Sequence, residues 1–176
     1  MAFDITIKGN SGHGSRPYEA NNPLDCFVDI YSGLKSLRMN NFSPFDPMTY
    51  SIGAVQMGNK YNQIPDKLRF RGSMRFFDRE KVGYKFYEDF KSLIINKSKA
   101  NNCKVIFDTY TKPRFQIIND LNLSALALTS MTDELGEDFV KEASPSMGSD
   151  TFATYSYQWP SLYIMLGINN EEKGSG

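Results

Sequence analysis

The stretch KLRFRGSMRF, residues 67–76, decides the fold of this chain. Its apolar residues and its glycine occupy every second position, and lysine, arginine and serine occupy the positions between them. Because successive side chains of a β-strand point to opposite faces of a sheet, this alternation predicts a strand with one apolar face and one basic face. An apolar sheet face has to be covered, so the neighbouring segments determine the architecture.

The segments on either side supply further strands. Residues 3–8 alternate in the manner of a half-buried strand, and residues 48–56 predict another. The loop at residues 57–66, which contains glycine, two asparagines and proline, leads from that strand into residues 67–76. A fourth strand is predicted from the alternation of Val105, Phe107 and Thr109, and it should end near Pro113.

Two helices are predicted from apolar residues at helical spacing. The first covers residues 23–38, with Asn21 or Asn22 as its cap and a proline in its first turn. The second covers residues 82–97. The resulting order of strand, helix, strand, strand, helix and strand is the ferredoxin-like βαββαβ arrangement, an α+β fold in which two helices cover one face of a four-stranded antiparallel sheet. Its open edges and open face favour the pairing of two copies.

The character of the sequence changes after Pro113. The elements expected there are a helix, a short strand, a short helix and a buried strand, at residues 120–135, 139–141, 149–157 and 162–168. About 60 residues supply too few elements to cover both faces of a parallel sheet. We therefore expect a ferredoxin-like domain at residues 1–112 and an incomplete α/β segment at residues 113–176.

The composition excludes several classes of function. Lys and Arg together number 20 and so do Asp and Glu, so no net charge attracts nucleic acid or an anionic membrane. One histidine and two cysteines, Cys26 and Cys103, cannot build a zinc site of several imidazoles or a disulfide framework. Without an apolar run of the length of a signal peptide or a membrane span, a reduced cytoplasmic setting is expected.

Three clusters carry residue types suited to chemistry. The only histidine, His13, lies in the loop GHGSRP, where an imidazole can polarise an oxygen; the alternative is an exposed turn histidine without a function. Asn62 begins the motif NQIPD and its amide can both donate to and accept from a substrate, or it can form an Asx turn. Arg75 offers a fork of donors that matches a carboxylate, or it is one of several solvated cations on a sheet face.

His13 belongs to the first of these clusters, and Asn62 and Arg75 belong to the second. The third cluster comes before the predicted helix at residues 149–157. Gly148 and Ser149 are small residues that can expose backbone N–H groups to an oxyanion, and Ser149 can equally serve as an ordinary helix cap.

Basic and aromatic residues interleaved on a strand also suggest a sheet that binds RNA. The phase of the alternation argues against it. Phe70 and Phe76 share the core face with Leu68 and Met74, whereas a stacking platform needs its aromatic residues on the open face.

Five motifs occur in an order that resembles one known family. They are GHGSRP at residues 12–17, NQIPD at 62–66, G-x-x-R at 72–75, IIND at 117–120, and MGSDTFATY at 147–155 before an apolar strand that ends in LGI. In this order they resemble the hippurate-hydrolase-like amidohydrolases, a zinc metallopeptidase family that includes aminoacylases, carboxypeptidases and succinyl-diaminopimelate desuccinylase. The resemblance extends from about Phe3 to Ile168.

The resemblance implies an arrangement of domains. Residues 1–112 are similar to the lid, or dimerisation domain, of these enzymes, and residues 113–176 to the C-terminal part of their two-zinc catalytic domain. It also implies a homodimer formed through the lid, with a small-molecule substrate and no nucleic acid or membrane partner.

The same resemblance implies roles for individual residues. His13 matches the lid histidine that reaches into the active site of the partner subunit and steadies the oxyanion. Asn62 matches a substrate-binding asparagine, and Arg75 an arginine that binds a substrate carboxylate. Gly148 and Ser149 match a loop of small residues near the substrate.

Two departures from the family pattern shape the expected function. The metal ligands and the catalytic glutamate of the family lie ahead of the lid, and its last metal-binding histidine would lie beyond Gly174. We therefore expect two zinc ions in the complete enzyme, none bound by this chain alone, and no activity of the chain by itself. The sequence Asp150-Thr151 also replaces two consecutive acidic residues.

The expected function is that of a fragment of a zinc-dependent amidohydrolase or peptidase that hydrolyses an N-acyl amino acid or a short peptide. The alternative left open is a self-standing, non-catalytic ferredoxin-like module for dimerisation or for binding a small ligand.

Overall fold

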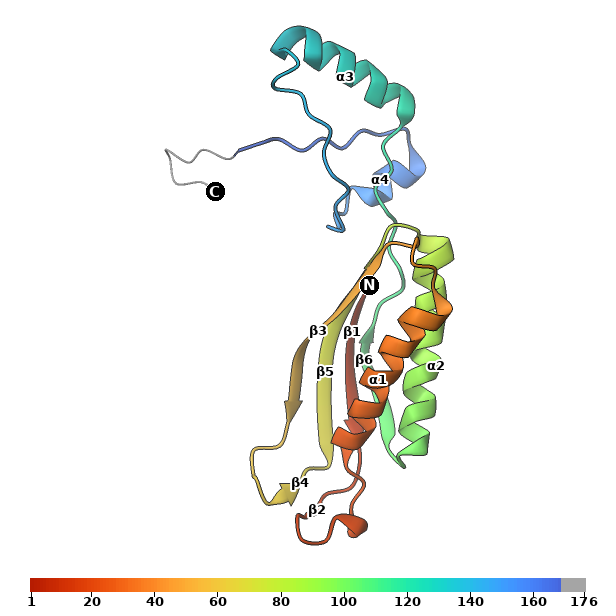
Figure 1. Cartoon of the computed structure of the whole chain (residues 1–176), viewed down its shortest axis with the longest axis vertical. Helices are drawn as coiled ribbons and strands as arrows, with labels where there is room; N and C mark the ends of the chain where they lie inside the picture. The colour runs from red at the N-terminus through yellow and green to blue at the C-terminus, as the bar shows by residue number, and fades with distance from the viewer. Residues whose placement is uncertain (169–176) are drawn as a thin grey trace. The chain divides into compact units, whose positions relative to one another are not determined.

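The computed structural model describes residues 1–168 and divides into two compact units, Met1–Arg114 and Phe115–Gly176. The first unit contains six strands, two α-helices and two short turns of helix (Figure 1). In chain order these are β1 Ala2–Lys8, β2 Gly12–His13, η1 Pro17–Glu19, α1 Pro23–Asn41, β3 Met48–Met57, β4 Gln63–Ile64, β5 Lys67–Phe76, η2 Arg79–Gly83, α2 Tyr84–Ala100 and β6 Lys104–Tyr110.

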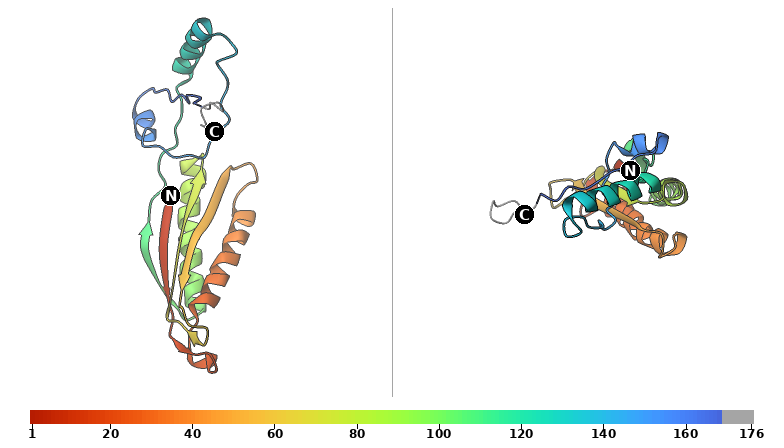
Figure 2. Two further views of the ribbon diagram at one scale, coloured as in Figure 1. Left: turned by 90° about the vertical axis from the view of Figure 1, so that its left-hand side faces the viewer. Right: turned by 90° about the horizontal axis from the view of Figure 1, so that it is seen from above.

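The main sheet has the strand order β3-β5-β1-β6, and every neighbouring pair is antiparallel. Helices α1 and α2 lie on one face of this sheet, as Figures 1 and 2 show. This arrangement confirms the predicted α+β, ferredoxin-like fold. Strand β5 has the predicted bounds, and α1 begins at Pro23 because the side chain of Asn22 accepts a hydrogen bond of 3.1 Å from the backbone N–H of Leu24.

The core lies between the helices and the apolar face of the sheet. Phe70 of β5 is fully buried beside Phe3 of β1 and Phe27 of α1, with ring centroids 6.2 Å and 5.2 Å away. Phe3 also makes an edge contact with Phe90 of α2. Each such side chain contributes roughly 1.5–3 kcal/mol by leaving water, so the alternation along β1 and β5 accounts for this core directly.

Strands β2 and β4 form a second, two-stranded sheet within segments that the sequence analysis assigned to loops. Gly12 pairs with Ile64 and His13 with Gln63. Two-residue strands are too short to show an alternating pattern, so only the tertiary pairing of distant segments reveals them.

The second unit contains α3, Leu121–Leu135, and α4, Ala153–Gln158. Helix α3 agrees with the prediction, and the side chain of Asp120 caps it by accepting from the N–H of Leu123 at 2.9 Å. The short strand predicted at residues 139–141 and the strand predicted at 162–168 are wrong, because both segments are irregular. A strand needs a neighbour to bond its backbone, and no strand occurs among residues 115–168.

The short helix before the second of these segments also begins later than predicted. The carboxylate of Asp150 accepts a hydrogen bond of 2.7 Å from the N–H of Phe152, so the chain turns there and α4 starts at Ala153. The cap position of α4 is Phe152 and no side chain caps the helix there, so the alternative in which Ser149 serves as the helix cap is wrong. Among residues 1–168, none of the helices combines the length and the apolar character that crossing a bilayer requires.

Candidate functional site

Two of the predicted site residues meet at one end of the first unit. We call residues 10–20 and 58–66 the tip; it contains β2, η1 and β4 (Figure 1). The N–H of Gly14 donates to the carbonyl oxygen of Asn62 at 2.9 Å, directly beside the pairing of His13 with Gln63. A side chain at position 14 would start 3.1 Å from that oxygen, so glycine permits the close approach.

A pocket of about 400 Å³ lies in the tip. It is lined by Ser11, Gly12, His13, Lys60, Asn62 and Gln63. The side chains of Lys60 and Asn62 make no hydrogen bond or ion pair with any other residue in the described part of the chain. An imidazole, an ammonium and an amide thus supply several donors to one concave surface, which suits an oxygen that carries or develops negative charge.

The imidazole of His13 is held on one side by a residue that the sequence analysis did not select. The backbone N–H of Ser15 donates to Nδ1 of His13 at 3.2 Å, and the hydroxyl of Ser15 lies 2.7 Å from the same nitrogen. His13 and Ser15 are two positions apart in GHGSRP, but the contact depends on how the turn folds, which the residue types alone do not indicate.

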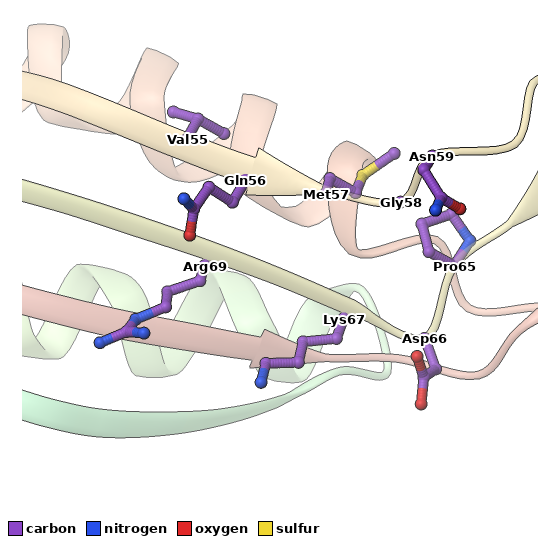
Figure 3. Close-up of a pocket in the computed structure, with 9 residues that line it drawn as sticks. All are labelled: Val55, Gln56, Met57, Gly58, Asn59, Pro65, Asp66, Lys67 and Arg69. Carbon is purple, nitrogen blue, oxygen red and sulfur yellow. The ribbon is translucent and has the colours of Figure 1, made fainter.

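An open groove of about 740 Å³ lies at the same end of the main sheet. Figure 3 shows its nine lining residues, which are Val55, Gln56, Met57, Gly58, Asn59, Pro65, Asp66, Lys67 and Arg69. The side chain of Arg69 binds both carboxylate oxygens of Asp4, at 2.7 Å and 2.5 Å, and this hydrogen bonding holds the pKa of Asp4 below its usual value. Much of the positive charge of Arg69 is therefore already balanced, so the groove is less basic than its residues suggest.

Arg75 lies at the opposite end of β5 from the tip. It is exposed on the open face of the sheet, where it pairs in register with Thr49 of β3. It lies eight positions after Lys67 along β5, which corresponds to about 26 Å of strand. Within one chain, the structure therefore brings His13 and Asn62 together and places Arg75 far from both.

Gly148 and Ser149 lie in the second unit, in the exposed segment before α4. The N–H of Gly148 donates to the hydroxyl of Ser146 at 3.2 Å, so that donor already has a partner. Helix α4 has only six residues, which gives its first turn little dipole.

The described residues do not fit a zinc site. Within residues 1–168, no three histidine, cysteine, aspartate or glutamate side chains come together in a way that could hold a metal ion. Cys26 and Cys103 are buried and free. Burial raises the pKa of Cys103 to about 11, so this thiol stays protonated near neutral pH.

Comparison with known proteins adds the family. A sequence profile of the peptidase dimerisation domain matches residues 1–99. The chain belongs to the peptidase dimerisation domain family. The chain is similar to Thermostable carboxypeptidase 2 of Saccharolobus solfataricus, with 27% identity over 180 residues that cover 98% of this chain and 43% of that protein. N-acetylcysteine deacetylase of Bacillus subtilis is 27% identical over 171 residues, covering 97% of this chain and 44% of its own length.

Solved structures show the same fold. A protein described as an aminohydrolase from methicillin-resistant Staphylococcus aureus superposes with a TM-score of 0.75 at 22% identity, over 90% of this chain and 40% of that one. A tripeptidase from Staphylococcus aureus superposes with a TM-score of 0.70 at 17% identity, over 90% and 41%. These findings confirm the family that the motifs indicated. They also show that this chain spans about two fifths of the length of its relatives.

Proposed function

We propose that this chain is the dimerising and substrate-contacting part of a zinc-dependent amidohydrolase that hydrolyses an N-acyl amino acid or a short peptide. The separation of the tip from Arg75 is the observation that carries this proposal. A substrate of this size cannot touch His13 and Arg75 of one chain when about 26 Å of β5 lies between them. A site that uses both residues requires a second copy of the chain.

Strand β3 offers the edge for such a pairing. It is the outermost strand beside β5, and Val55 on it is 47% exposed. On the adjoining helix α1, Val28 is 52% exposed and Tyr31 is also exposed, so an apolar strip runs alongside the edge. At the other edge, Tyr110 of β6 is held against α2: its ring lies tilted against that of Tyr87, with centroids 4.7 Å apart, and its hydroxyl donates to the carbonyl oxygen of Tyr87 at 2.7 Å. An edge strand with apolar neighbours favours pairing with another copy.

Two-fold symmetry then dictates which residues meet. Two identical strands related by a two-fold axis pair antiparallel, so the Met48 end of β3 lies beside the Met57 end of its copy. Met48 is opposite Phe76, next to Arg75, whereas Met57 is opposite Leu68 at the tip end. Pairing through β3 thus carries the tip of one chain toward the Arg75 end of the other.

In this dimer each residue has a distinct task. The tip of one copy contributes His13, whose ring donates to the oxyanion that forms at the amide carbon, and Asn62, whose amide binds the substrate. The other copy contributes Arg75, whose guanidinium fork holds the substrate carboxylate. Gly148 and Ser149 are proposed to line the substrate on the catalytic side.

We assign the two zinc ions to residues outside this chain, since the described residues do not gather metal ligands. Zinc in such an enzyme activates the attacking water and polarises the amide. Residues 113–176 are proposed as the C-terminal part of the domain that holds it. With two buried, free thiols and balanced charge, we place the protein in the cytoplasm without a nucleic acid or membrane partner.

A complementation experiment tests the shared site in the complete enzyme. His13→Ala alone should lower turnover by about 10²-fold, as the loss of one oxyanion donor does. Arg75→Ala alone should mainly weaken binding of the substrate carboxylate. Mixed dimers of the two variants contain one intact site, so random mixing should recover about one quarter of the wild-type activity. Mixing that recovers nothing would place both residues in the same chain's site and contradict the proposal.

The 176-residue chain itself provides a second test. Purified alone, it should not hydrolyse N-acyl amino acids and should not bind two zinc ions tightly. If the chain alone did hydrolyse them, or did bind two zinc ions tightly, the assignment of the metals to residues outside this chain would be wrong. A coding sequence upstream of Met1 with a His-rich motif and a Glu-Glu pair would support the enzyme, whereas its absence would favour the self-standing module.

A further inference from the structure

The contact between Ser15 and His13 determines more than the position of the ring. The turn is closed by a hydrogen bond of 2.8 Å from the N–H of Arg16 to the carbonyl oxygen of His13. This turn brings the backbone N–H of Ser15 to 3.2 Å from Nδ1 of the imidazole. The hydroxyl of the same residue lies 2.7 Å from Nδ1. The backbone N–H and the hydroxyl of Ser15 therefore face the same ring nitrogen.

The chemistry of the backbone amide decides where the ring proton lies. A backbone N–H can only donate, so Nδ1 must present its lone pair to Ser15. The neutral imidazole then carries its proton on Nε2. Within residues 1–168, Nε2 has no hydrogen-bond partner, so this N–H remains available.

We propose that Ser15 is a positioning residue that fixes His13 as the Nε2–H tautomer, so that the tip presents a donor rather than a lone pair to the substrate oxygen. This inference deepens the proposed function and rests on it for its catalytic meaning. The opposite tautomer would turn the Nε2 lone pair toward a developing negative charge and repel it. Ser15 thus determines whether Nε2 of His13 attracts or repels the negatively charged substrate oxygen.

The tip also contains a matched control. Ser11 lines the same pocket and is exposed like Ser15, but it makes no hydrogen bond to His13 or to any other residue that the structure describes. Ser11→Ala removes the same hydroxyl group from the same loop and leaves Nδ1 untouched.

The experiment is nitrogen NMR of the ¹⁵N-labelled 176-residue chain. His13 is the only histidine, so its two ring nitrogens are assigned without further variants. In a buffer alkaline enough to keep the imidazole neutral, Nδ1 should show a pyridine-type shift and Nε2 a pyrrole-type shift. Ser15→Ala keeps the backbone donor and loses the hydroxyl, so the ratio of the two tautomers should fall about fivefold. Ser15→Thr should restore it, and Ser11→Ala should leave it unchanged.

The spectrum of the wild-type chain already decides the tautomer, and a predominant Nδ1–H form would overturn the inference. So would an equal change in Ser11→Ala. A Ser15→Ala spectrum equal to that of the wild type would assign the tautomer to the backbone N–H of Ser15 alone and overturn the contribution of its hydroxyl. Because Ser15 is exposed, Ser15→Ala should keep the folded amide spectrum.

Activity separates this inference from the proposed function. In the complete enzyme, Ser15→Ala should lower kcat in proportion to the fall in the Nε2–H fraction, with little change in KM, and Ser15→Thr should recover it, because the oxyanion exists only during reaction. If the tautomer is as proposed but His13→Ala leaves turnover unchanged, the proposed function fails while the role of Ser15 in the ring stands. If His13→Ala abolishes turnover and the tautomer does not depend on Ser15, only the present inference fails.

Discussion

The two units of the chain differ in what their apolar residues do. In Met1–Arg114, apolar side chains from the sheet and from both helices close a single core. In the second unit, Ala153 is the one buried side chain among residues 115–168, while Leu121 and Leu166 are 85% and 86% exposed. The first unit therefore contains the groups that stabilise it, whereas the second presents apolar surface of the kind that folded proteins cover.

Local helix signals do not account for this difference. Helix α1 is capped by Asn22 and helix α3 by Asp120, each with a side-chain oxygen bound to a backbone N–H of the first turn. Both caps satisfy a free donor and stabilise their helix similarly. What separates the units is tertiary burial, which in the proposed enzyme the rest of the catalytic domain would supply to the second.

The largest expected effect comes from a substitution in the core of the first unit. Phe70→Ala removes a ring with no exposed surface, which packs against Phe3 and Phe27. Its loss should lower the free energy of unfolding by about 3–5 kcal/mol, through lost burial and the cavity that remains. Denaturant unfolding followed by far-ultraviolet circular dichroism measures this change.

The matched variant in the second unit is Leu126→Ala in α3. Leu126 is mostly exposed, so its truncation should change the free energy of unfolding by no more than about 0.5 kcal/mol. The fluorescence of Trp159, the only tryptophan, follows the second unit separately. Similar losses in the two variants would contradict the contrast between the units.

A smaller effect tests how tightly the first unit is packed. Gly72 faces the core from β5, and a Cβ atom there would lie 2.2 Å from the carbonyl oxygen of Ser51 and 2.4 Å from the ring of Phe3. Gly72→Ala should therefore cost about 1–3 kcal/mol of the free energy of unfolding through overpacking. Gly53 on β3 has no atom within 4 Å of its would-be Cβ, so Gly53→Ala is the control in the same sheet. Equal losses at both glycines would show that strand propensity, and not packing, limits the sheet.

The same contrast explains what could be predicted from the sequence. The alternation in β5 identifies a strand because its side chains see a core within the unit, and the bounds of β1, β3 and α1 follow nearly as well. The stretch at residues 162–168 is equally apolar, yet it forms no strand. Hydrophobicity indicates that a segment is to be buried, but it does not indicate whether a neighbouring strand is present to form backbone hydrogen bonds with it.

The candidate site divides in a similar way. Residue types alone selected His13, Asn62 and Arg75 as suited to binding an oxygen or a carboxylate. Their arrangement in space could not be predicted from the sequence, because the pairing of β2 with β4 joins segments about 50 residues apart and leaves no periodic pattern in the sequence. The contact of Ser15 with Nδ1 depends on a turn whose closure only coordinates reveal.

The smallest expected effect concerns the open face of the main sheet, where the ion pair of Arg69 with Asp4, rather than apolar packing, is expected to stabilise the fold. The hydrogen bonds from Arg69 lower the pKa of Asp4, so the native chain binds that proton less readily than the unfolded chain does. The pair therefore stabilises the fold fully above the ordinary carboxyl pKa of about 3.9, and this contribution disappears as the pH falls through the lowered native value. Asp4→Asn should be less stable than the wild type near neutral pH, by less than the glycine variant, and the difference should close in acid.

Salt provides the control for that interpretation. Both side chains of the pair are partly accessible to solvent, so about 1 M salt should reduce the neutral-pH difference between Asp4→Asn and the wild type. Thermal unfolding across the acid range measures both dependences. A difference that stayed constant from neutral to acid pH, and that ignored salt, would mean that Asp4 acts through the shape of its side chain. Packing would then stabilise the open face as it stabilises the core, and the interpretation that charge stabilises one face of the sheet and packing the other would be wrong.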